Sequence, residues 1–173
     1  LESFEGKSSL MNSAKLFHSF FQKEPSITTS AHGRVNLIGE HTDYNNGFVL
    51  PSLIPQSIEV SICLREDDKI IGISSEFGEL QSITSSPKDG TWLDFVRGAI
   101  YFCQKISPSL RGMEVAVSST IPSGSGLSSS AALETALLRA ISQLKDITIH
   151  SQEMARIGQQ IEHQFVGTQC GIM

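Results

Sequence analysis

The run GRVNLIGEHTDY, residues 33–44, brings one arginine, two carboxylates, an imidazole and an amide together in a short stretch that contains two glycines. At the rim of a strand, such a stretch can direct several hydrogen-bond donors and acceptors at one small polar ligand. Sugar hydroxyls both donate and accept, and they bind carboxylates well. The run therefore predicts a binding site for a sugar.

Each side chain of this run also has a plainer interpretation. Arg34 could stabilise negative charge on a transferring phosphoryl group, or it could form a structural ion pair with Glu40 or Asp43. The two acids could converge on a ligand or stand in a solvated loop. His41 could donate to a sugar oxygen or be an ordinary turn histidine, and Asn36 has the same ambiguity. The combination, rather than any single residue, carries the prediction.

A second run, PSGSGLSSSAA at residues 122–132, predicts a phosphate-binding loop. Gly124 and Gly126 let the backbone approach a ligand closely. The apolar run 127–144 predicts a helix, whose unpaired N–H groups and positive dipole end would face that ligand. No Gly-Lys-Ser/Thr follows, so the loop is not a Walker A motif. A turn that only caps the helix is the alternative for an isolated Gly-x-Gly, but the three serines and the upstream run favour a polyphosphate.

Together the two runs resemble the sugar-recognition motif of galactokinases and the PxGxGLSSSA phosphate loop of their wider group, the GHMP family of small-molecule kinases. The continuation TDYNNG, residues 42–47, separates galactokinases from mevalonate and homoserine kinases. One position departs from the family pattern, because His32 stands where a proline is usual. We expect this change to alter backbone rigidity rather than chemistry.

The resemblance implies ATP-dependent phosphorylation of galactose at its anomeric hydroxyl, with Mg²⁺ as the cofactor. Arg34 would be the catalytic residue beside the γ-phosphate and the catalytic base. The implied galactose-binding residues are Glu40, His41, Thr42 and Asp43. The implied ATP-binding residues are Gly124, Ser125, Gly126, Leu127, Ser128, Ser129 and Ser130.

Ser130 and Glu162 resemble the family pair that holds Mg²⁺, an ion that accepts a few protein oxygens together with phosphates and water. Without the family spacing, Glu162 would be interpreted as an exposed acid on a helix. Trp92 matches a family tryptophan near the adenine, yet its spacing fits a core position equally well.

Hydrophobic periodicity predicts a two-layer α+β domain, with strands first and then a strand–loop–helix unit followed by another helix. The resemblance specifies it as a GHMP kinase N-terminal domain, a mixed sheet packed against helices. The expected helices are 14–21, 92–103, 127–144 and one that begins after Ser151. The expected strands are 27–38, 58–64, 69–74, 80–84 and 113–117.

Composition agrees with a cytoplasmic enzyme. The 173 residues suffice for one domain with a core, and the net charge of −5 argues against nucleic-acid or anionic-membrane partners. No stretch is apolar for long enough to cross a membrane. The three cysteines lack CxxC spacing, which favours reduced thiols over a disulfide framework or a zinc site.

The ends of the chain suggest a fragment. Residues 1–10 are interpreted as an expression remnant because Met11 looks like a natural start, and residues 11–173 as an N-terminal sugar- and ATP-binding domain. The run 167–173 resembles the family segment that leads directly into the catalytic aspartate. We therefore expect the C-terminal half of the same protein as a partner and no activity from this chain alone. An N-acetylgalactosamine kinase, or a galactokinase-like sensor of sugar and ATP without catalysis, remain alternatives.

Overall fold

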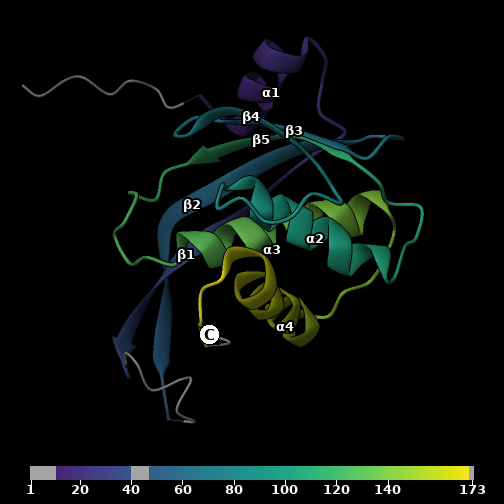
Figure 1. Cartoon of the computed structure of the whole chain (residues 1–173). Coiled ribbons are helices and arrows are strands. Elements are labelled where there is room, and N and C mark those ends of the chain that lie inside the picture. The colour runs from purple at the N-terminus through teal and green to yellow at the C-terminus, as the bar shows by residue number, and fades with distance from the viewer. Residues whose placement is uncertain (1–10, 40–46, 172–173) are drawn as a thin grey trace, which may run out of the picture.

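The computed structural model describes residues 11–39 and 47–171, which form a five-stranded sheet and helices on both of its faces (Figure 1). Helices α2 and α3 cover one face, α4 packs against these two helices on the side away from the sheet, and α1 lies on the other face. The α+β prediction is confirmed. In chain order the elements are α1 Ser13–Phe21, β1 Ile27–Ile38, β2 Leu50–Leu64, β3 Lys69–Ser74, β4 Gly78–Ile83, α2 Leu93–Gln104, β5 Met113–Ser119, α3 Ser129–Leu144, α4 Ser151–Ile161 and a π-helical turn, Glu162–Val166.

The sheet is mixed, with strand order β1-β2-β5-β3-β4. Strand β5 lies at its centre, antiparallel to β2 and parallel to β3. All but the last residue of β5 are buried, as expected for a strand covered on both faces. The parallel pair is possible because α2 lies in the long connection between β3 and β5.

Strand β2 has buried side chains on both faces of the sheet. Ile58, Val60 and Ile62 are buried in the core beneath α2, α3 and α4. Cys63 packs instead with Phe17 of α1, on the other face. Alternating apolar and polar residues are typical of a half-buried strand, but α1 covers the second face, so this part of β2 is buried on both sides.

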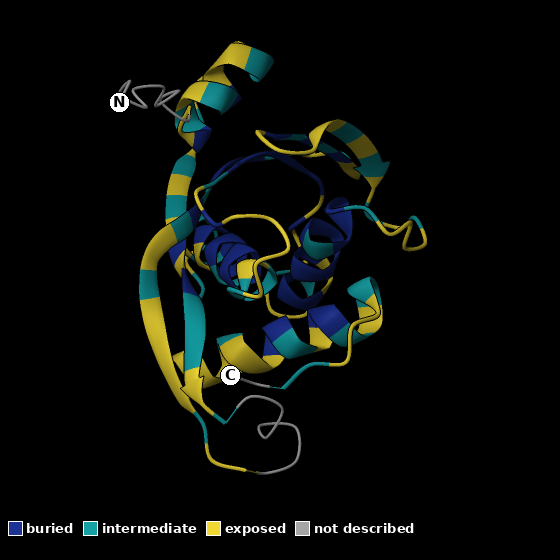
Figure 2. Cartoon of the chain, turned by 90° about the vertical axis from the view of Figure 1, so that its left-hand side faces the viewer, coloured by how far each residue is buried: buried dark blue, intermediate teal, exposed yellow. Residues whose placement is uncertain are grey.

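The first half of β2 was not predicted. It pairs only with β1, because β5 begins to pair at Ile58. Pro51 and Pro55 disfavour a strand in this half, since proline cannot donate to a ladder. They are tolerated here because one side of this half has no neighbouring strand among the described residues. This part of the β1–β2 hairpin extends beyond the sheet and is mostly exposed (Figure 2).

The helical layer differs from prediction mainly at the helix ends. Helix α3 begins at Ser129 rather than at Leu127, because Ser128 takes a left-handed conformation with φ 59°. Helix α4 widens into the π-helical turn, where Phe165 packs against Tyr101 and Phe102 of α2. No helix within residues 11–39 and 47–171 has the length and hydropathy needed to cross a membrane.

A core substitution in β2 tests this packing. Ile62 is fully buried, so Ile62→Ala should lower the free energy of unfolding by about 2–5 kcal/mol through lost burial and the cavity left behind. Urea unfolding of the purified chain measures this loss. The matched control is Ile106→Ala, since Ile106 is 51% exposed and should lose less than about 1 kcal/mol. Equal losses for the two variants would contradict the described core.

Candidate active site

The two sequence motifs meet through the backbone. The N–H of Arg34, on β1, donates to the carbonyl oxygen of Leu127 at 3.0 Å. Gly33 makes this approach possible, because a Cβ at this position would lie 2.8 Å from the same oxygen and 2.9 Å from Ile121 Cδ1. The strand that carries Arg34 is therefore fixed against the residues that precede α3.

The loop before α3 is exposed and glycine-rich in the way a ligand-binding loop requires. Gly124 and Gly126 have φ values of 68° and 69°, which glycine adopts without strain. Ser125 Oγ donates to the carbonyl of Pro122 at 2.7 Å. The side chain of Ser128 makes no capping hydrogen bond, so the first turn of α3 lacks the usual side-chain acceptor. An anion with several oxygens could accept from these N–H groups.

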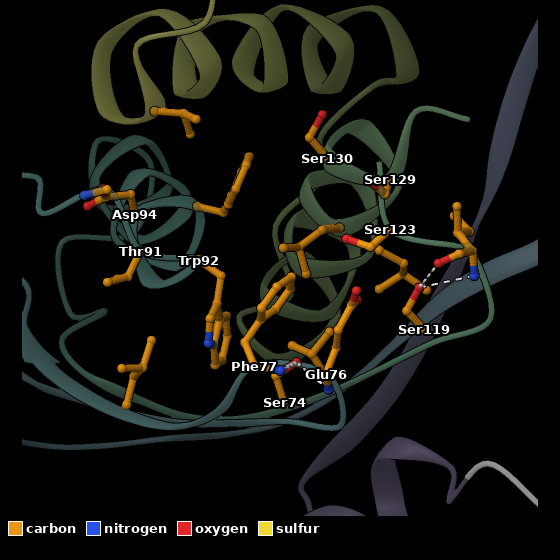
Figure 3. A pocket seen from close by; sticks show the side chains of 18 residues that line it. Ser74, Glu76, Phe77, Thr91, Trp92, Asp94, Ser119, Ser123, Ser129 and Ser130 are labelled. Carbon is orange, nitrogen blue, oxygen red and sulfur yellow. Dashed lines mark hydrogen bonds between the residues drawn. The ribbon is translucent and has the colours of Figure 1, made fainter. Parts of the chain in front are cut away.

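A cavity of about 480 Å³ lies beside this loop. Figure 3 shows Ser123, Ser129 and Ser130 on one side of it, with Trp92 and Phe77 across from them. Its remaining lining is largely apolar, which suits a small ligand held by a few polar groups. Trp92 is a core residue that also lines the cavity: it is only 9% exposed, and its buried Nε1 has no hydrogen-bond partner among the described residues. A position near the adenine stays a prediction.

A buried ion pair supports one wall of the cavity. Asp94 and Arg97, at the start of α2, are each 1% exposed and form a salt bridge. Asp94 also accepts from the N–H of Gly90 at 2.8 Å, and Arg97 donates to Ser82 Oγ of β4 at 2.7 Å. The network fixes the segment that leads into Trp92. Sequence reasoning missed this pair, whose only signal was opposite charges three residues apart at the start of a helix.

Two buried carboxylates lie in the helical layer, one within α3 and the other at the end of α4. Glu162 is 6% exposed, so its interpretation as an exposed acid is wrong. Glu134, four residues after Ser130 on α3, is 3% exposed and its Oε1 has no hydrogen-bond partner. Desolvation raises the pKa of Glu134 to about 9, and the charge of Glu162 adds to the effect. In the part of the chain that the structure describes, no three His, Cys, Asp or Glu side chains group together in a way that could hold a metal.

Two family comparisons match this chain. The GHMP kinases N terminal domain matches residues 94–173, and the galactokinase galactose-binding signature matches residues 15–63. Both parts of the chain are thus similar to the GHMP kinase family. Each match covers one part of the site: the galactokinase signature includes Arg34, and the N-terminal domain match includes the serine loop.

Comparison with solved structures gives similar proteins. A galactokinase from Lactococcus lactis complexed with galactose is 30% identical with a TM-score of 0.81, over 92% of this chain and 43% of that one. A putative sugar kinase from Campylobacter jejuni is 25% identical, with a TM-score of 0.67, over 82% of this chain and 46% of that one. Mevalonate kinase from Methanococcus jannaschii, at 20% identity and a TM-score of 0.70 over 84% and 49%, shares the fold. The chain thus spans less than half the length of each of these proteins.

The structure describes only some of the site residues that the GHMP resemblance implies. The structure joins the backbone of Arg34 to the serine loop at Leu127, and Ser129 and Ser130 of that loop line the cavity, whereas Arg34 is not among the lining residues. The galactose-binding residues expected at 40–43 lie outside the described residues. Glu134 was missed, although a single acid within the apolar run of α3, next to Leu133, was a signal that could have been used.

The pKa of Glu134 makes a prediction about stability. Between its ordinary value of 4.5 and about 9, the folded chain holds a proton that the unfolded chain has released. Stability should therefore fall as the pH rises through this window, by up to about 1.4 kcal/mol per pH unit. Glu134→Gln should remove this slope, as measured by urea unfolding at pH 6 and pH 8 in the presence of a chelator. Identical slopes for the variant and the wild type would contradict a buried neutral Glu134.

Proposed function

We propose that this chain is the N-terminal part of a galactokinase, which transfers the γ-phosphoryl group of MgATP to the anomeric hydroxyl of galactose and gives galactose 1-phosphate. The contact between Arg34 and Leu127 is the observation that carries the proposal, because it joins the strand bearing the galactose-binding signature to the serine loop. The likeness to the galactose-bound Lactococcus enzyme supports the choice of sugar.

Phosphoryl transfer of this kind depends on positioning and on electrostatic stabilisation. The N–H groups of residues 124–130 and of the first turn of α3 would donate hydrogen bonds to the phosphate oxygens. The cavity between the serine loop and Trp92 would hold the remainder of the nucleotide. Arg34 would stabilise the charge that develops on the transferring group. The proton of the sugar hydroxyl would pass to a catalytic base, which the family resemblance implies is an aspartate.

The residues present fit a magnesium ion. Glu162 and Glu134 are buried, and neither forms an ion pair with any described residue, so a positive charge would complete their surroundings. Ser130 and Glu162 would hold the ion, as hard oxygen ligands suit Mg²⁺. Bound there, Mg²⁺ would neutralise charge on the β- and γ-phosphates.

The complete enzyme would contain a further segment that corresponds to the half of its relatives this chain does not span. The β1–β2 hairpin offers apolar surface for it, since several large side chains there are exposed. They are Leu37, Ile38, Phe48, Leu50 and Leu53.

The complete protein tests the proposed activity. We expect ADP release in a coupled assay that requires both galactose and MgATP. Turnover only with N-acetylgalactosamine would instead identify a kinase for that sugar. Binding of galactose and ATP without turnover would identify a sensor, and either result would contradict the proposal.

Variants of the sugar motif test the assignment of residues. Glu40→Ala and Asp43→Ala should each raise the KM for galactose about 10- to 150-fold, because each removes a charge-assisted hydrogen bond worth roughly 1.5–3 kcal/mol. The KM for ATP should change little. The control is Glu66→Ala, an exposed acid in the loop between β2 and β3. Equal losses for both substrates would show that the motif is structural.

A further inference from the structure

Two short faces of α3 and α4 lie against each other. Ser130 and Glu134 are four residues apart on α3 and therefore share one face of that helix. Gly158 and Glu162 have the same spacing, and the N–H of Glu162 still donates to the carbonyl of Gly158 although the π-helical turn begins there. The two residues expected to hold magnesium thus each have a neighbour one turn along the helix.

These neighbours contact each other. Glu134 Oε2 lies 2.9 Å from the position that a Cβ at residue 158 would occupy. With a side chain at residue 158, this carboxyl group could not keep its present position against the backbone of α4. The packing therefore directs Glu134 toward the helix that carries Glu162, rather than toward solvent.

The buried position of Glu134 has no explanation in packing alone. Its neighbours on α3, Leu133, Leu137 and Leu138, are buried apolar side chains. A carboxyl group that serves only the fold would be expected to have hydrogen-bond partners, because an unsatisfied buried polar atom is costly. Glu134 Oε1 has none, and no described Lys, Arg or His forms an ion pair with it. What it lacks is a cation.

We infer that Glu134 is a third protein group of the cation site, and that its carboxylate binds the divalent ion together with Ser130 and Glu162. The inference rests on the proposed function, which supplies the ion as part of a metal–nucleotide complex. Two carboxylates balance the charge of one divalent cation, and all three side chains offer the hard oxygen ligands that Mg²⁺ and Mn²⁺ accept.

Binding of Mn²⁺ tests the inference without catalysis. The complete protein, saturated with a non-hydrolysable ATP analogue, is titrated with Mn²⁺, and the free ion is measured by electron paramagnetic resonance. We expect Glu134→Gln and Glu162→Gln each to raise the Kd for Mn²⁺ at least tenfold. The matched control is Glu153→Gln, which removes the same charge from an exposed position on α4 and should leave the Kd within twofold of the wild type.

The outcomes separate this inference from the proposed function. If Glu162→Gln weakens Mn²⁺ binding and Glu134→Gln does not, Glu134 is not part of the cation site and the inference is wrong. If the wild type itself binds no Mn²⁺, the cation site of the proposed function is wrong as well.

A second variant tests the inference if Glu134→Gln does not fold. Gly158→Ala leaves every charge in place but puts a Cβ 2.9 Å from Glu134 Oε2, so it should raise the Kd for Mn²⁺. If Glu134→Gln shows no cooperative unfolding transition, Gly158→Ala decides the question. An unchanged Kd would then overturn the inference.

Discussion

One backbone hydrogen bond, from Arg34 to the carbonyl of Leu127, holds together the two parts of the site. It joins the edge strand β1 to the loop that opens α3, although the two lie far apart in sequence. The bond depends on Gly33, because any side chain there would meet Leu127 and Ile121 at less than a normal contact distance. The position of Arg34 relative to the serine loop is therefore set by the fold, before any ligand binds.

The charged groups buried in the helical layer are of two kinds. Asp94 and Arg97 neutralise each other, and their remaining bonds tie α2 to β4 and to the segment before Trp92. Burying such a pair is costly, but each charge has its opposite partner within the pair. Glu134 and Glu162 are both acids and have no cationic partner among the described residues. The first pair positions the cavity wall, whereas the second consists of two carboxyl groups that a cation could bind.

Periodicity predicted β5, α2, α3 and α4 well because each has an apolar face that the core requires. It could not predict the first half of β2, where prolines are tolerated only because no strand pairs on one side. The left-handed conformation of Ser128 and the π-helical turn are likewise set by tertiary contacts. The glycine loop was visible from local chemistry, whereas the roles expected for Glu162 and Arg34 came only from family spacing. Glu134 was overlooked because one acid in an apolar helix has no function until its neighbours in space are known.

A crystal structure of the complete protein with galactose, Mg²⁺ and a non-hydrolysable ATP analogue tests the central claim most directly. We expect the triphosphate against the N–H groups of residues 124–130, with Arg34 within hydrogen-bond distance of the γ-phosphate and galactose bound by residues 40–43. A triphosphate that does not contact the serine loop, or a sugar bound away from the strand that carries Arg34, would contradict it.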